Sequence, residues 1–593
     1  MKTDRCKKLS CKEQPLDPER PGRIESLDVN SSPSLLLNIA LALQHVLVLS
    51  SLCALVVDTL IQEVDKERIV AYVLFCSGIS TLLQSWIGSR LPLILAPSLD
   101  FLIPALTLLS AQSGTAVACR GQCTEPEEPV APAHPIRELK GMAVVAGLVQ
   151  LAVGLTGLAG FALGHCGPLV LAPLLCILGF SIFREAALFC SDHWGMAALA
   201  IVLLVILSQH LHYFLQLSVF SVCKRLSVLL SVMVTCGVCA ALVHWGHVHL
   251  NSVTQMLSTK RNATFIQSRN GPHSSDFGFP NDSVPWLDFP LPAPALPLLS
   301  GKSIAAGVAG GLSSSISSPA VYVVAARLLK VPVPPAHACN RGLCVDGLGS
   351  VLSGLMGAPV GLCSSVPNAC VIGLSQSGSR STVQLAGVLL LILGVSPQLA
   401  QMLCSVPLAI HGALLGVTYT LAVATGITYF QHADVDSGRN IFNIGFTVFM
   451  SLALPRWFRL HSSFIQTGVP SVDVFLQSLL TLPVFFVGVL AFLLEHTVSG
   501  TLPERGLVRH EGTKKILSLA DQQQGYSRSP DAVYDPPPPV MKVLDLSGLR
   551  TVPFCACRSP PVEEVVVAVP EMSSLLPDKD AGVSTILPKL VFE

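Results

Sequence analysis

The chain is dominated by apolar runs of about 18 residues or more, each long enough to cross a hydrocarbon core of roughly 30 Å as a helix. Backbone N–H and C=O groups in lipid must be paired inside the protein, so runs of this length are typical of membrane helices. A 51% hydrophobic content with only 12% charged residues supports the same interpretation. The sequence therefore predicts an all-α polytopic membrane protein, with spans at 34–57, 69–89, 141–160, 164–183, 194–215, 226–247, 303–326, 343–363, 381–400, 404–428, 440–455 and 472–494.

Two further apolar segments, 91–110 and 364–380, are interrupted by prolines such as Pro97 and Pro367. Counting them gives about fourteen segments, seven on each side of the polar loop 248–299, as in transporters built from inverted repeats. Pro97 lies 63 residues after residue 34, and Pro367 lies 64 after residue 303. This spacing predicts an inverted repeat, with short strands at the two broken helices; the alternative is that two common proline kinks coincide by chance.

The predicted organisation follows the apolar pattern. We expect a cytosolic N-terminal segment (1–32) and two seven-span repeats (33–247 and 300–502) flanking an extracellular loop (248–299), with a disordered cytosolic tail (503–593) rich in proline and polar residues. No cleaved signal peptide is expected, because the first thirty or so residues contain no apolar stretch.

Potential modification sites support this orientation. Asn262 and Asn281 begin N-x-[ST] sequons in the loop 248–299, which an odd number of spans places outside if the N-terminus is inside. Cys119 and Cys123 lie in a predicted extracellular loop, where they could form a disulfide.

Charge and motifs exclude several classes of function. The 37 basic residues balance 37 acidic ones, so no global field would attract nucleic acid. The sequence also lacks a metal-ligand cluster, a nucleophile elbow and a phosphate loop, which argues against an enzyme and against a bound cofactor.

Polar residues inside predicted spans are the candidate site residues, because an ionisable group in lipid usually faces a cavity or a partner. Gln44 and His45 lie in the middle of the first span and could line a cavity or tie two packed helices together. Asp100 lies in the first broken segment, where a half-helix N-terminus offers free N–H groups to a ligand. Its carboxylate could instead cap that helix or bind sodium.

The second half supplies the facing candidates. Pro367 and Asn368 lie in the second broken segment, where backbone N–H groups should again be free. Ser317 belongs to a run of serines suited to a neutral solute or a hard cation, although serines also permit close helix packing. Asp346 is the remaining intramembrane carboxylate, a candidate sodium ligand or the partner of a nearby cation.

From about residue 33 to 508 the sequence resembles the nucleobase–ascorbate transporter family. The resemblance rests on short blocks of sequence: Gln44-His45, Phe101-Leu-Ile-Pro104-Ala105, Pro334-Pro335-Ala-His337-Ala-Cys-Asn340-Arg341-Gly342, Gly378-Ser379-Arg380, Ser437-Gly-Arg439-Asn440-Ile-Phe, Leu454-Pro455 and Pro503-Glu504-Arg505-Gly506-Leu507. It implies core and gate domains that bind a planar solute between them, with movement of the core and commonly sodium coupling. It also implies that Phe101 belongs to the substrate site.

The chain departs from the family pattern at several positions. In the tenth span Cys370, Ser375 and Gln376 replace a glycine, a threonine and a basic residue. Ser317 aligns with the carboxylate by which relatives hold their substrate, whereas Asp100 stands where relatives carry a small residue. We therefore hypothesise that a carboxylate has been relocated across the site.

The resemblance favours a plasma-membrane transporter with both termini cytosolic. The expected partners are a small-molecule substrate, sodium as coupling ion, the lipid bilayer and a second copy of the chain. A purine nucleobase of the hypoxanthine or xanthine type is preferred, because Asp100 and the loss of a basic residue at Gln376 disfavour an anion. Pro367 favours ascorbate instead, and a transport-inactive scaffold or regulator is the second alternative.

Overall fold

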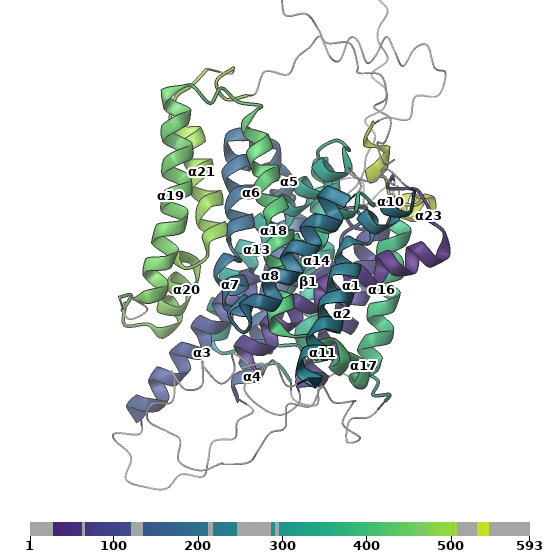
Figure 1. The fold of residues 1–593 in the computed structure, drawn as a ribbon. Coiled ribbons are helices and arrows are strands. Elements are labelled where there is room, and N and C mark those ends of the chain that lie inside the picture. Colours follow the sequence, from purple (N-terminus) through teal and green to yellow (C-terminus); the bar gives the residue numbers. More distant parts are fainter. Residues whose placement is uncertain are drawn as a thin grey trace, which may run out of the picture. The chain divides into compact units, whose positions relative to one another are not determined.

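A computed structural model describes residues 28–61, 66–119, 134–211, 218–245, 286–290, 296–461, 464–501, 503–506 and 530–544, with nearly all regular structure helical (Figure 1). All of these residues belong to one compact unit, residues 1–556. The first half contains α1 (Leu35–Leu60), α2 (Lys66–Trp86), β1 (Leu95–Pro97), α3 (Leu99–Cys119), α4 (His134–Thr156), α5 (Leu158–His165), α6 (Pro168–Phe180), α7 (Phe183–Cys190), α8 (Trp194–Val205), the π-helical turn η1 (Ile206–His210), α10 (Ser218–Arg225) and α11 (Ser227–His244).

The second half repeats the pattern of long helices around one short strand. It contains α13 (Gly301–Leu329), α14 (Ala336–Met356), β2 (Leu362–Ser364), α15 (Val366–Ser375), α16 (Arg380–Val395), α17 (Pro397–Cys404), α18 (Leu408–Phe430), α19 (Gly438–Leu460), α20 (Pro470–Leu480) and α21 (Pro483–Thr497). A 3-10 turn, η2 (Pro530–Tyr534), and a short helix, α23 (Pro538–Leu544), follow in the tail.

Eight helices among the described residues are long and apolar enough to cross a membrane, or up to ten if each of two bent pairs counts as one span. The polytopic all-α class is therefore confirmed, and the total of about fourteen segments remains a prediction. The apolar stretches at Leu99–Ala111, Trp194–His210 and Val366–Ser375 are not counted among these spans because each has only 10–17 residues.

The prediction that 381–400 and 472–494 are continuous spans is wrong. The first bends by 107° between α16 and α17, and the second bends by 74° between α20 and α21. In each case a proline, Pro397 or Pro483, begins the following helix. Proline lacks a backbone N–H and its ring clashes with the preceding turn, so it readily starts a helix and rarely continues one.

The two proline-containing segments are interrupted as the sequence predicts. Each consists of a buried three-residue strand followed directly by a half-helix, β1 by α3 and β2 by α15. The strands pair antiparallel, with Leu95 opposite Ser364 and Pro97 opposite Leu362. Antiparallel pairing of equivalent strands is the arrangement that an inverted repeat requires, because its two halves run in opposite directions through the membrane.

Equivalent helix pairs also approach each other in the same way. Helix α2 packs along α16, and α4 packs along α14. Because α2 and α14 occupy the same place in their two halves, as do α4 and α16, these two pairs are equivalent. A Cβ atom added to Gly78 would lie 2.8 Å from the carbonyl oxygen of Gly387, and one added to Gly147 would lie 2.6 Å from that of Gly347. Glycines at both crossings therefore let the helix backbones touch, as small residues do in membrane proteins.

Gly147→Ala is expected to destabilise the fold by about 1–3 kcal/mol, because overpacking a closed helix crossing forces the backbones apart. The measurement is the midpoint of thermal unfolding of the purified protein in detergent. Gly237→Ala is the matched control, since an added Cβ there meets nothing within 4 Å. Equal midpoints for the two variants would contradict the close approach.

The helices form two groups by their packing. In the core group α4 packs on α13 and α14, α16 packs on α1 and α2, and α3 packs on α13. In the gate group α18 packs on α6 and α8, and α21 packs on α6 and α19. The groups touch mainly at three places: where α13 of the core group meets α20 of the gate group, where α15 of the core group meets α18 of the gate group, and where α1 meets α18.

Candidate functional site

A small cavity lies where the paired strands of the core group face the gate group. Its volume is about 20 Å³, which holds roughly one water molecule. The core group contributes Leu52, Pro97, Ser98, Leu99, Asp100, Ser317, Val321, Cys363, Ser364, Ser365 and Val366, and the gate group contributes Leu178, Ser181, Tyr419 and Val484. A planar organic solute can enter only if the two groups separate.

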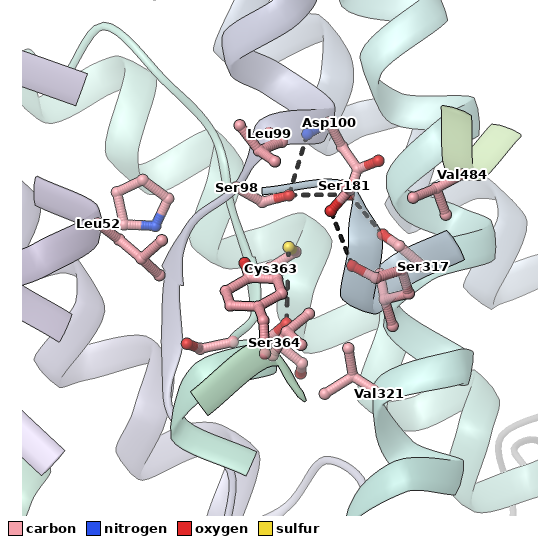
Figure 2. Close-up of a pocket in the computed structure, with 15 residues that line it drawn as sticks. Leu52, Ser98, Leu99, Asp100, Ser181, Ser317, Val321, Cys363, Ser364 and Val484 are labelled. Carbon is pink, nitrogen blue, oxygen red and sulfur yellow. Dashed lines mark hydrogen bonds between the residues drawn. The ribbon is translucent and has the colours of Figure 1, made fainter. Parts of the chain in front are cut away.

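Asp100 is the only charged residue among the described residues that line this cavity. Its side chain is buried, and one of its oxygens accepts hydrogen bonds from the hydroxyls of Ser317 at 2.6 Å and Ser98 at 2.8 Å (Figure 2). The other oxygen accepts a third hydrogen bond, from the hydroxyl of Ser313 at 2.6 Å. Hydrogen bonds to an ionised carboxylate are stronger than those between neutral groups. The three serines therefore satisfy the buried carboxylate, and no ion pair to it occurs among the residues that the structure describes.

The start of α3 explains why this carboxylate is directed into the cavity. Ser98 occupies the turn between β1 and α3, where its carbonyl oxygen accepts from the backbone N–H groups of Phe101 and Leu102 and its hydroxyl accepts from that of Asp100. Ser98 thus pairs the free backbone N–H groups at the start of α3. The Asp100 carboxylate bonds instead to hydroxyls, two of them on α13, so the alternative that it caps the helix is not what the structure shows.

The hypothesis of a relocated carboxylate has a simple geometric basis. Ser317 and Asp100 come from different halves of the chain, yet the Ser317 hydroxyl donates directly to the Asp100 carboxylate. A carboxylate at either position would therefore occupy nearly the same part of the cavity wall.

The start of the half-helix α15 also borders the cavity, through Ser365 and Val366. Ser365 precedes it and accepts hydrogen bonds from the backbone N–H of Asn368 at 3.5 Å and from its side-chain amide at 3.0 Å. Asn368 Oδ1 lies 3.2 Å from Nδ1 of His45 on α1. The first turn of this half-helix contains Pro367 and Asn368, and His45 contacts it. None of these three residues lines the cavity.

Two other predicted residues have structural contacts. Gln44 accepts a hydrogen bond from the backbone N–H of Leu229 at 3.3 Å, which ties α1 to α11 and corresponds to the helix-packing alternative. The buried ring of Phe101 lies against Gly310 and Gly361, where an added Cβ would approach it to 3.4 Å and 2.9 Å. Neither side chain lines the cavity in this conformation.

Asp346 lies behind the cavity in a second polar network. Its carboxylate, fully buried, accepts hydrogen bonds from Tyr322 at 2.9 Å and from Ser364 at 3.3 Å, and Tyr322 in turn accepts from Gln84 at 3.2 Å. Ser364 also lines the cavity. One hydroxyl therefore separates Asp346 from the space next to Asp100.

Sequence reasoning missed the contribution of the gate group. Ser181, which directly follows α6, and Tyr419 of α18 both line the cavity. Tyr419 lies in an otherwise apolar run, where a single sequence gives no signal that distinguishes a cavity-lining tyrosine from a packed one. The serines at 98 and 313 do lie beside predicted site residues, and hydroxyls flanking an intramembrane carboxylate are a usable signal.

Several predicted sites fall outside the described residues. Cys123, Asn262 and Asn281 are among these, and only the backbone of Cys119 is described, as the last residue of α3. Helix α3 therefore extends beyond the predicted boundary at residue 110. The predicted disulfide and glycosylation sites remain predictions.

Comparison with known proteins identifies the class. Residues 37–460 match the Permease family. Mouse solute carrier family 23 member 3 is 38% identical over 88% of this chain and 86% of its own length. Rat solute carrier family 23 member 1 is 31% identical over 76% of each chain, and nucleobase-ascorbate transporter 3 of Arabidopsis thaliana is 26% identical over 73% of this chain and 76% of its own. Among solved structures, the transmembrane domain of the cyanobacterial bicarbonate transporter BicA matches with a TM-score of 0.39 and 13% identity, over 78% of this chain and 99% of that one.

Broken helices that meet at a cavity between two groups of membrane helices define a transporter, and the matches to permeases and solute carriers agree. The chain belongs to the nucleobase–ascorbate transporters of solute carrier family 23. It is a membrane transporter and not an enzyme.

Proposed function

We propose that the chain is a sodium-dependent carrier that moves a purine nucleobase of the hypoxanthine or xanthine type across the plasma membrane. The observation that carries the proposal is the Asp100 carboxylate, the single charged group among the described residues of the cavity wall. A carboxylate accepts hydrogen bonds and donates none when ionised, so it favours a solute that presents N–H donors. A neutral purine presents such donors.

Electrostatics disfavour ascorbate, which is an anion at neutral pH. An anion in this cavity would face Asp100, and the other described lining residues offer hydroxyls, a thiol and apolar groups. Like charges in a site of low dielectric repel strongly, because little water is present to screen them. Ascorbate remains the second candidate because Pro367 resembles the ascorbate branch of the family.

Sodium coupling is supported by the position of Asp346. Hard cations prefer oxygen ligands, and Asp346, Ser364 and Tyr322 bring carboxylate and hydroxyl oxygens together. Because Ser364 touches both Asp346 and the cavity, a cation bound at Asp346 would change the wall that meets the solute. This contact is the physical link that coupling requires.

Alternating access follows from the small size of the cavity. Its walls come from both helix groups, so separation of the core group from the gate group opens it, as in carriers whose repeats move around a fixed site. The first and last described segments of the chain lie on one face, since Arg380 donates to the Asn30 side chain and to the carbonyl oxygen of Val533. We place that face in the cytosol.

A homodimer is part of the proposal. Helix α19 of the gate group exposes aromatic side chains, including Phe442 at 59% and Phe449 at 70%, that must meet lipid or another protein. In a dimer the gate groups would form the fixed part against which each core group moves.

The deciding experiment measures uptake of radiolabelled hypoxanthine and ascorbate into cells that express the chain, with sodium and with choline replacing it. We expect saturable hypoxanthine uptake only in sodium, with ascorbate at background. Ascorbate uptake alone would favour the second candidate. Surface delivery without flux of either solute would favour the transport-inactive scaffold.

A further inference from the structure

Three arginines of the core group converge on one short segment of the tail. Arg90 follows α2, Arg341 lies in α14 and Arg380 begins α16. Arg380 Nη2 donates to the carbonyl oxygen of Val533, Arg341 Nη2 to that of Tyr534 at 2.7 Å, and Arg90 Nε to that of Asp535 at 3.0 Å. Three successive backbone carbonyls are thus bound by three guanidinium groups.

Tyr534 is the anchor of this contact. Its side chain has no exposed surface, and its hydroxyl donates to the carbonyl oxygen of Pro332 in the connection between α13 and α14. Burial of an aromatic ring together with its polar end is typical of a specific docking contact. The segment is therefore seated in a pocket rather than resting on the surface.

The arginine pocket, defined as Arg90, Arg341, Arg380 and Pro332, is built around the tail. Arg341 and Arg380 are both nearly inaccessible, at 3% and 8% exposed. Buried cations require acceptors, and here the tail supplies one main-chain carbonyl to each of these two arginines. Because those acceptors are backbone groups, the pocket recognises a peptide in a 3-10 turn that carries one aromatic side chain.

The length of chain between the gate group and this tail segment permits the segment to detach. Gly506 packs near the end of α18, where a Cβ atom added to it would lie 2.2 Å from the carbonyl oxygen of His432, and the next described residue is Pro530. The 24 peptide steps between them can span up to roughly 80 Å when extended. The length of the chain therefore does not prevent this segment from leaving the pocket while both helix groups stay folded.

We propose that residues 530–535 are a detachable plug, held in the arginine pocket as a peptide ligand supplied by the chain itself. The plug braces the helix ends from which the site is built. Strand β1 begins at Leu95, five residues after Arg90, and Asp346 lies five residues after Arg341. Release of the plug loosens the ends of the elements that position Asp100 and Asp346.

The test uses purified full-length protein and a fluorescent synthetic peptide that corresponds to residues 528–540. A tethered segment competes at an effective concentration of about millimolar, so the wild-type pocket is occupied and binds the free peptide weakly. In Tyr534→Ala the pocket is open, and we expect the peptide to bind at least ~10-fold more tightly. A peptide with alanine in place of its tyrosine should not bind.

Pro538→Ala is the matched control, because that side chain is exposed and lies in the same tail. It should behave as the wild type, and adding Arg341→Ala to Tyr534→Ala should abolish peptide binding. Equal peptide affinity for the wild type and Tyr534→Ala, or no binding to either, would overturn the proposal.

Amide hydrogen exchange tests the plug without relying on a destabilised variant. In the wild-type protein residues 530–535 should exchange at least ~10-fold more slowly than in Tyr534→Phe, which retains the ring but loses the hydrogen bond to Pro332. If the wild-type segment exchanges as fast as the isolated peptide, the plug does not exist in solution.

Discussion

Asp100→Ser is expected to lower uptake about 10- to 100-fold, because a hydrogen bond to a charged group contributes about 1.5–3 kcal/mol to binding. The same loss should be partly reversed by adding Ser317→Asp. The Ser317 and Asp100 side chains touch at 2.6 Å, so the double variant returns a carboxylate to the cavity wall from the opposite half of the chain. Initial uptake rates of the two variants and the wild type, corrected for surface expression, provide the measurement.

The control for this exchange is Asp288→Asn, which removes a partly exposed carboxylate outside the cavity. That carboxylate forms an ion pair with Arg68, with 3.2 Å between Asp288 Oδ2 and Arg68 Nε. It should leave uptake unchanged. If Asp100→Ser transports normally, the solute does not bind through this carboxylate. If Asp100→Ser is inactive and the double variant is no better, the carboxylate acts at position 100 alone and the relocation hypothesis is wrong.

Asp346→Asn is expected to raise the sodium concentration for half-maximal uptake by roughly tenfold or more, because affinity for a hard cation follows the charge and number of its oxygen ligands. The substitution keeps the shape of the side chain and removes its charge. Uptake measured over a range of sodium concentrations at fixed solute reports this shift. Apparent solute affinity at saturating sodium should change far less.

Tyr322→Phe is the matched control for Asp346→Asn. It removes one hydrogen bond to the carboxylate, at 2.9 Å, while keeping the charge. We expect a smaller shift in sodium dependence than with Asp346→Asn. An unchanged sodium dependence in Asp346→Asn, with solute affinity lost, would place the coupling ion elsewhere and make Asp346 part of the structural support for Ser364.

The broken segments show how much of the site the sequence could predict. Prolines at 97 and 367 indicated two interrupted helices at equivalent places, and the structure places a strand and a half-helix at each. Asp100 could be chosen as a candidate site residue from the sequence, because burying a carboxylate inside a membrane span costs free energy and usually marks a functional site. Local chain chemistry was sufficient because proline and charge act on their own segment.

Other residues could not be placed from the sequence. Gln44 and His45 are adjacent, yet one contacts α11 and the other contacts α15, because neighbouring residues on a helix point about 100° apart. Phe101 follows Asp100 but packs against glycines of α13 and of the loop before β2. The direction of each side chain depends on which helix happens to pack beside it, and periodicity does not contain that information.

The sequence by itself determined that this protein is a membrane protein, and that each half contains one proline-containing segment in which the helix is interrupted by a strand. These properties follow from the cost of exposing backbone polar groups to lipid and from the geometry of proline. Only the tertiary structure decided that Asp100 and Ser317 share one point, that the gate group closes the cavity with Tyr419, and that Tyr534 returns to the core group. Each of these contacts joins residues far apart in the chain, and their meeting depends on how whole helices pack.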